Sequence, residues 1–136
     1  MKSRTLLVVD ADPKVRALVK ARMEAEGWRV RQAATGLQAL AICACRSFDA
    51  VLTDLNLPGI GADELAHAIL ERFPAVTIIG MSAEPPDSPP ATISGWLRKP
   101  LEAETLAGRL LEVLQATPKK QAAGAAAALY RLRKPG

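Results

Sequence analysis

Short apolar runs alternate along this chain with longer segments in which apolar residues recur at helical spacing. The apolar runs predict five strands, at Thr5–Val9, Trp28–Ala33, Ala50–Thr53, Val76–Met81 and Trp96–Arg98. The segments between them predict helices, from Pro13 to just before Gly27, from Gly36 to about Arg46, over Asp63–Phe73 and over Leu101–Gln115. This alternation predicts βαβ units, and therefore an α/β fold with a parallel sheet and helices on both faces.

Local signals support the helix boundaries. Asp12 is a good N-cap, and Pro13 suits the first helical position because it lacks the N–H that would be unpaired there. Gly27 is expected to end the same helix as its C-cap. In the second helix the apolar spacing predicts a buried side made of Leu37, Leu40, Ala41 and Ala44.

The connection between the fourth and fifth strands is unusual in its composition. Of the thirteen residues 83–95, four are prolines: Pro85, Pro86, Pro89 and Pro90. Proline inside a helix removes a hydrogen bond and clashes with the preceding turn, so we expect at most one turn, in Ala91–Ser94. The connection should otherwise be an extended, polyproline-like crossover.

Length and charge indicate one domain followed by a basic tail. The 136 residues fit a single domain with an ordinary core, since about half of them are apolar. Residues 119–136 contain five basic residues and no acidic one, so the rest of the chain is nearly neutral, with 13 basic and 14 acidic residues. We therefore expect a domain at 1–117 and an Ala-rich tail at 118–136 that is disordered or marginally helical.

The remaining composition excludes several classes of protein. Cys43 and Cys45 have no matching Cys or His pair, so a zinc site lacks ligands, and both are expected to be small buried hydrophobic residues. His67 stands alone and is given no catalytic role. The first apolar run is too short for a signal peptide, and none approaches a membrane span. We expect a cytoplasmic protein.

Charged residues stand where three of the predicted strands end. Asp10 follows the first strand, Asp54 ends the third and Lys99 follows the fifth. In open α/β sheets the crevice outside the carboxyl ends of the strands is where ligands bind. These strand ends therefore predict one crevice that gathers two carboxylates and a lysine.

The chain resembles the receiver domain of two-component response regulators over about Thr5 to Ala116. Four pieces at successive strand ends carry the resemblance: Leu6–Asp10, Asp54–Gly59, Met81–Ala83 and Trp96–Pro100. The resemblance implies a flavodoxin-like, doubly wound, five-stranded parallel sheet of strand order 2-1-3-4-5. In this chain the fourth helix is expected to be shortened or replaced by the Pro-rich loop.

The resemblance also implies phosphoryl transfer to Asp54 from a histidine kinase or a histidine phosphotransfer protein. Asp54 would be the nucleophile and would form an aspartyl phosphate. By the family's pattern Mg²⁺ would be held by Asp10, Asp54 and the backbone carbonyl of Asn56. Such a protein is a phosphoacceptor in a phosphorelay rather than a turnover enzyme.

Three further residues match positions that contact or report the phosphoryl group in the family. Lys99 would neutralise a phosphoryl oxygen, and Ser82 would form a hydrogen bond with another. Trp96 stands at the switch-aromatic position and would move when Ser82 is drawn to the phosphoryl group. The alternatives are an ordinary surface role for Lys99, a turn role for Ser82 and plain packing for Trp96.

The first strand end departs from the family's pattern. The family usually has two consecutive acids there, whereas this chain has Asp10 followed by Ala11. The missing acid is normally a direct ligand of the metal, so magnesium binding should be weaker. Asp12 is a tentative substitute ligand, with helix capping as its alternative role.

The main interpretation is a stand-alone receiver that signals by contact with an unknown downstream protein. The first alternative is a pseudo-receiver that binds partners without phosphorylation, which Ala11 and the altered fourth connection favour. A remote alternative is a phosphatase of the haloacid-dehalogenase type with Asp10 as nucleophile, against which Lys14 stands at a position that this family gives to Thr or Val. Nucleic-acid contact by the basic tail is weakly supported.

Overall fold

The computed structural model describes residues 4–84, 86–88 and 90–116, which form five strands and four helices. In chain order the elements are β1 (Thr5–Val9), α1 (Pro13–Ala25), β2 (Arg29–Ala33), α2 (Gly36–Cys45), β3 (Ala50–Asp54), α3 (Ala62–Arg72), β4 (Thr77–Ser82), β5 (Gly95–Arg98) and α4 (Ala103–Ala116). These bounds lie within one or two residues of the predicted ones. No helix in this part of the chain is long and apolar enough to cross a membrane. The predicted tail, 118–136, lies outside the described residues.

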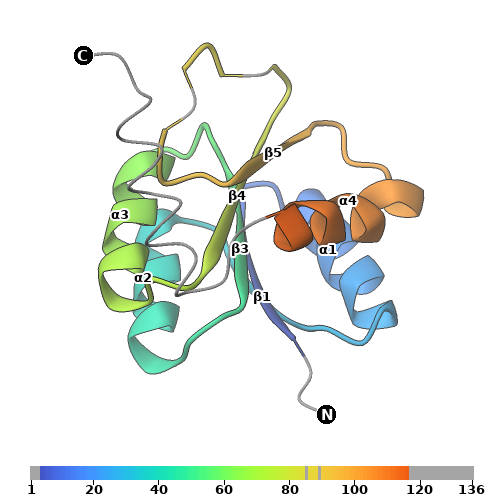
Figure 1. Cartoon of the computed structure of the whole chain (residues 1–136), viewed down its shortest axis with the longest axis horizontal. Helices are drawn as coiled ribbons and strands as arrows, with labels where there is room; N and C mark the ends of the chain where they lie inside the picture. The colour runs from blue at the N-terminus through green and yellow to red at the C-terminus, as the bar shows by residue number, and fades with distance from the viewer. Residues whose placement is uncertain (1–3, 85, 89, 117–136) are drawn as a thin grey trace.

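The five strands form one parallel sheet in the order β2-β1-β3-β4-β5, which confirms the predicted flavodoxin-like topology. Val9 pairs with Thr53 and Ser82 pairs with Arg98, so these strands end almost level with one another. The residues that follow them therefore meet at a single edge of the sheet. Figure 1 shows the central strands between two layers of helices.

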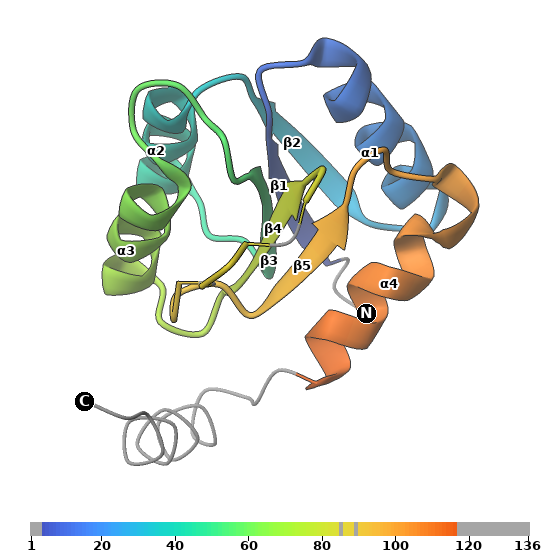
Figure 2. The same cartoon turned by 90° about the horizontal axis from the view of Figure 1, so that it is seen from above.

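Each face of the sheet is covered by a pair of helices. Helices α2 and α3 lie on one side, and α1 and α4 lie on the other (Figures 1 and 2). Leu7, Val51 and Ile78 point into the first core, whereas Leu6, Leu52 and Ile79 point into the second. Strands buried on both faces explain the continuous apolar runs that identified them in the sequence.

The ends of α1 follow the signals in the sequence. The Asp12 carboxylate accepts a hydrogen bond from the Lys14 N–H at 2.9 Å, and Pro13 is the first helical residue. Gly27 has a φ of +91°, in the left-handed region that favours glycine after a helix. The predicted N-cap is therefore confirmed, whereas the C-cap is Glu26 and Gly27 is the residue that follows it.

The predicted buried side of α2 is largely wrong. Leu37 is 69% exposed, and of the four residues expected inside only Leu40 packs against the core. The buried residues of α2 have small side chains instead, namely Gly36, Ala39 and Cys43. Cys45, which was also expected to be buried, is exposed. A Cβ on Gly36 would lie 3.1 Å from the Cβ of Ile60. The small residues allow α2 to lie close to its neighbours, which a count of large apolar residues does not detect.

The crossover between β4 and β5 contains no helix within its described residues, as predicted. One turn is closed by the Ile93 N–H, which donates to the Pro90 carbonyl at 3.0 Å. The Ile93 side chain packs against the core on the α3 side, and the Ser94 N–H donates to the carbonyl of Ile78 at 2.7 Å. The helix labelled α4 is thus the last helix of the domain, after β5.

Candidate functional site

Asp10 is a buried carboxylate whose two oxygens are both paired. Its side chain is 2% exposed, just beyond β1. Oδ1 accepts a hydrogen bond from the Asp12 N–H at 2.8 Å, and Oδ2 accepts one from Lys99 Nζ at 2.6 Å. A buried charge is tolerated only when it is paired and hydrogen-bonded in this way.

Asp54 ends β3 and is more accessible than Asp10, with a side chain that is 15% exposed. Its Oδ1 accepts a hydrogen bond from the Asn56 N–H at 3.1 Å, which fixes the turn after the strand. Its Oδ2 lies 3.5 Å from Lys99 Nζ. Asp54 is therefore the carboxylate that an incoming group can reach, and its charge is partly balanced beforehand.

Lys99 joins the two carboxylates. Burial lowers the pKa of Lys99, but hydrogen bonds and charge attraction from Asp10 and then Asp54 more than compensate, so the pKa lies above its ordinary value of 10.5. The side chain is 22% exposed, and its backbone is tied to β4 because the Lys99 N–H donates to the Ser82 carbonyl at 2.8 Å. A permanent positive charge thus lies beside both acids.

Ser82 and Trp96 form a second group at the same edge. Ser82 is 5% exposed at the end of β4, and its hydroxyl oxygen accepts a hydrogen bond from the Trp96 indole N–H at 2.6 Å. The Ser82 hydroxyl in turn donates to the backbone carbonyl of Glu84. The side chains of the predicted switch pair are therefore in direct contact.

The oxygen donors near Asp54 suit a magnesium ion, with one acid fewer than usual. The carboxylates of Asp10 and Asp54 and the predicted carbonyl donor of Asn56 are hard oxygen groups of the type that Mg²⁺ prefers. Ala11 supplies no donor, and the Asp12 carboxylate is used to cap α1. Nowhere in the described residues do three acidic, histidine or cysteine side chains gather as metal ligands do.

Arg16 contacts the site but was not predicted from the sequence. Its Nη1 donates to the Asp10 backbone carbonyl at 2.6 Å, and its Nε donates to the Gln32 side chain at 3.3 Å. Arg16 thus ties the loop after β1 to the end of β2. The position of Arg16, about one turn into the helix after Asp10, could have suggested this contact. The residue type alone does not show that the long side chain folds back toward Asp10.

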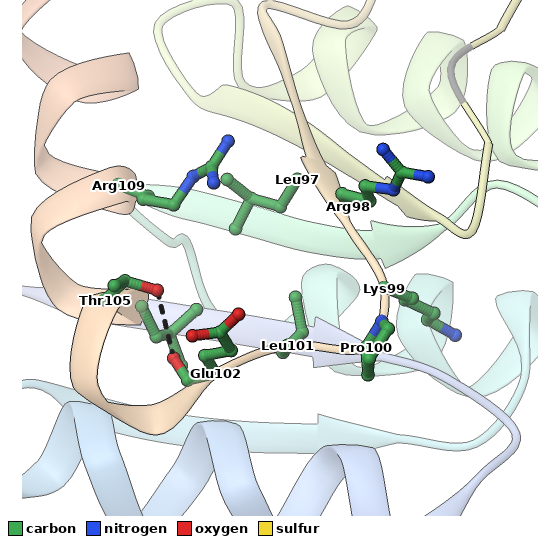
Figure 3. Close-up of a pocket in the computed structure, with 9 residues that line it drawn as sticks. Leu97, Arg98, Lys99, Pro100, Leu101, Glu102, Thr105 and Arg109 are labelled. Atoms are coloured by element: carbon green, nitrogen blue, oxygen red, sulfur yellow. Dashed lines mark hydrogen bonds between the residues drawn. The ribbon is translucent and has the colours of Figure 1, made fainter.

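Two cavities lie near this edge of the sheet. One, of about 850 Å³, lies between the loop after β3, the start of α3 and the crossover, and its walls include Asn56, Ser82 and Glu84. The other, of about 260 Å³, lies between β5 and α4 (Figure 3). Arg98, Lys99 and Arg109 line the smaller cavity, and neither Asp10 nor Asp54 lies in the wall of either cavity. The larger cavity adjoins the turn after Asp54 through Leu55 and Asn56.

The fold and this cluster of acids and lysine define a class of protein, which comparison with known proteins identifies. Residues 6–111 match the response regulator receiver domain family. The chain belongs to that family.

Relatives and solved structures agree with this assignment. The chain is 27% identical to the probable transcriptional regulatory protein TcrX of Mycobacterium tuberculosis over 120 residues, which is 83% of this chain and 50% of TcrX. It is 30% identical to the sensor protein EvgS of Escherichia coli K12 over 79 residues, 58% of this chain and 7% of EvgS. The chain thus spans half or less of the length of these two relatives. The chemotaxis protein CheY4 of Vibrio cholerae superposes with a TM-score of 0.77 at 27% identity, over 82% of this chain and 99% of CheY4.

Proposed function

We propose that this protein accepts a phosphoryl group on Asp54 from a histidine kinase or a histidine phosphotransfer protein and signals by protein–protein contact. The observation that carries the proposal is the Lys99 ammonium group, which lies 2.6 Å from Asp10 and 3.5 Å from Asp54. A fixed positive charge beside an accessible carboxylate is what the approach of an anionic phosphoryl group requires. Asp54 is the accessible carboxylate of the two.

The transfer forms one bond and breaks one. A carboxylate oxygen of Asp54 attacks phosphorus, and the P–N bond of the donor phosphohistidine breaks, leaving its electron pair on the imidazole nitrogen. Asp54 Oδ1 accepts a hydrogen bond from the Asn56 N–H, and Oδ2 faces Lys99 at 3.5 Å, so we propose Oδ2 as the attacking oxygen. Lys99, already beside Oδ2, then pairs with a phosphoryl oxygen as a point charge.

Asp10, Asp54 and the Asn56 carbonyl would hold the magnesium ion that the family uses. The ion supplies positive charge that screens the repulsion between phosphoryl group and carboxylate. This chain offers two carboxylates to the ion. The net charge of Asp10, Asp54 and Lys99 together is −1. The expected metal affinity is therefore low.

A pseudo-receiver is the second candidate, because Ala11 stands where the family has its second acid. In that case the same fold would bind its partner without phosphorylation. The two candidates differ in whether the protein gains a phosphoryl group.

Intact-protein mass spectrometry tests the proposal. The protein is incubated with a small phosphodonor, in magnesium and then in chelator, beside Asp54→Ala. We expect one added phosphoryl group that depends on magnesium and is absent from the variant. No adduct at any magnesium concentration would favour the pseudo-receiver.

A further inference from the structure

Arg16 joins the loop after β1 to the neighbouring strand. Its Nη1 donates to the backbone carbonyl of Asp10 at 2.6 Å, and its Nε donates to the side chain of Gln32 at 3.3 Å. Gln32 lies near the end of β2, next to Ala33, whose carbonyl accepts the Asp10 N–H at 3.1 Å. The N–H and the carbonyl of Asp10 are therefore both tied to β2, the first directly and the second through Arg16.

The carbonyl of Asp10 is linked to the carboxylate of the same residue by a short series of contacts. The peptide unit that contains this carbonyl is planar, so its orientation sets the direction in which the chain leaves Asp10. The Asp12 N–H, two residues on, donates to Asp10 Oδ1 at 2.8 Å. The Arg16 N–H donates to the Asp12 carbonyl at 3.2 Å. Arg16 thus contacts the loop at both ends, and a shift of the Asp10 carbonyl would disturb a hydrogen bond to the Asp10 carboxylate.

Ala11 makes the placement of Asp10 especially important in this chain. The Ala11 side chain offers no oxygen, and the Asp12 carboxylate caps α1. Asp10 is the acid of this loop that faces Lys99, at 2.6 Å. The loop therefore offers a metal ion one well-placed carboxylate, and groups that orient a ligand affect metal affinity almost as strongly as the ligand does.

We propose that Arg16 is a positioning residue for the magnesium ion: its contacts with the Asp10 carbonyl and with Gln32 hold the Asp10 carboxylate in the orientation that the ion requires. The contact is with the backbone of Asp10 rather than with its carboxylate, so Arg16 acts through the loop. This inference rests on the proposed function, because the ion is the one that phosphoryl transfer to Asp54 would use.

A guanidinium group suits this task better than an ammonium group. Its planar fork presents several N–H donors at fixed angles, so one group serves two separate acceptors, whereas lysine carries a point charge on a flexible stem. The positive charge of Arg16 has the opposite influence on the metal, since it repels a cation. Positioning and charge therefore predict opposite changes in magnesium affinity when Arg16 is replaced by a neutral residue.

Magnesium titrations of the full-length protein separate these two effects. Binding is followed by NMR through the amides of Asp54 and Asn56, at constant ionic strength and without a phosphodonor. We expect Arg16→Lys, which keeps the charge, and Arg16→Met, which removes it, both to bind magnesium roughly tenfold more weakly than wild type. Lys20→Met is the matched control, because it removes one charge from the same helix, where Lys20 forms an exposed pair with Glu24 at 2.6 Å. The control should bind magnesium as wild type does.

Gln32→Ala is a milder variant that leaves Arg16 in place. It removes the acceptor of the Arg16 Nε hydrogen bond, so we expect a smaller loss of magnesium affinity in the same direction. Circular dichroism checks that each variant is folded, and the rate of phosphorylation over a range of magnesium concentrations gives a second readout. Weaker metal binding raises the magnesium concentration at half-maximal rate and leaves the saturated rate close to that of wild type. A loss of folded protein would lower the saturated rate instead.

The possible results separate the positioning role from the proposed function. Magnesium binding that is unchanged in Arg16→Lys and unchanged or tighter in Arg16→Met would overturn the positioning role, because charge alone would then explain the effect of Arg16. A wild-type protein that gains a phosphoryl group, together with an Arg16→Lys variant that needs no more magnesium to do so, would also refute the positioning role alone. A wild-type protein that binds no magnesium and gains no phosphoryl group would refute the proposed function, and the positioning role with it.

Discussion

The cluster of Asp10, Asp54 and Lys99 and the start of the crossover both lie at the carboxyl edge of the sheet, but they are held in place differently. In the crevice, Asp10, Asp54 and Lys99 hold one another by charge, and Asp10 is almost fully buried. In the crossover, the start of the segment is held by one hydroxyl group and the middle by an exposed contact from Thr92 to Asp63 at 2.9 Å.

The two regions therefore differ in how easily their contacts can rearrange. Charge pairing in a buried place is strong and hard to rearrange, which suits a site that must keep its geometry. The single hydrogen bonds at the start and in the middle of the crossover are more easily exchanged. The Pro-rich connection between β4 and β5 thus leaves the contacts among Asp10, Asp54 and Lys99 in place.

The largest effect is expected from Lys99→Met, which removes the charge that holds the crevice together. Asp10 would remain buried without its partner, so the free energy of unfolding should fall by about 3 kcal/mol in urea titration. Phosphorylation should slow by roughly a hundredfold. Because the pKa of Lys99 is raised, its contribution is fully present through the neutral range, where the carboxylates are ionised, and is lost as the pH rises through the higher folded value. The stability gap between wild type and variant should therefore be constant across the neutral range, and a gap near zero would show that Asp10 needs no partner.

A smaller effect on stability is expected where the loop after β3 contacts β4. A Cβ added at Gly80 would lie 2.6 Å from Leu55 Cδ2, so Gly80→Ala should lower the free energy of unfolding by about 2 kcal/mol. Leu55→Ala in the same chain should recover part of that loss, because it removes the clashing atoms. The double-mutant cycle measures this coupling, and strict additivity of the two changes would contradict it.

Ala11→Asp restores the second acid to the crevice. We expect magnesium to bind about tenfold more tightly, since affinity follows the number and charge of the oxygen ligands. Isothermal titration calorimetry measures the affinity directly, and Ala11→Asn adds a side chain of the same shape without the charge. An affinity that Ala11→Asp leaves unchanged would show that Asp12 already acts as the missing ligand.

The smallest effect is expected from Thr92→Ala in the crossover. The hydrogen bond from Thr92 to Asp63 is exposed, so its loss should lower the free energy of unfolding by only about 0.5 kcal/mol. Phosphorylation of Asp54 should proceed at the wild-type rate. A loss as large as that of Lys99→Met would mean that the crossover is held more firmly than its contacts indicate.

The strand ends are the part of the molecule that sequence reasoning predicted best. Asp10, Asp54 and Lys99 follow strands of a parallel sheet, and the carboxyl ends of such strands meet at one edge whatever the details of packing. The capping pair Asp12 and Pro13 was equally predictable, because its chemistry is local. These features depend on neighbours in the sequence or on topology alone.

Contacts that depend on shape or on the backbone were not predictable. The buried face of α2 uses Gly36 and Ala39 because the helix lies close to its neighbours, Ile60 among them, whereas apolar spacing predicted Leu37 instead. The bond from Ser82 to Glu84 ends on a backbone carbonyl, which every residue type has. The residue type therefore identified Ser82 as a candidate site residue, but it could not predict which group accepts its hydrogen bond.

The most direct test of the account is to locate the phosphoryl group on the chain. After reaction with a phosphodonor, borohydride reduces an aspartyl phosphate to homoserine, and trypsin separates the peptide that begins at Ser47 and ends at Arg72 from the peptide that begins at Thr5 and ends at Lys14. We predict homoserine at Asp54 in the first peptide and an unmodified second peptide. Homoserine at Asp10 would make Asp10 the nucleophile and contradict the assignment of Asp54 as acceptor.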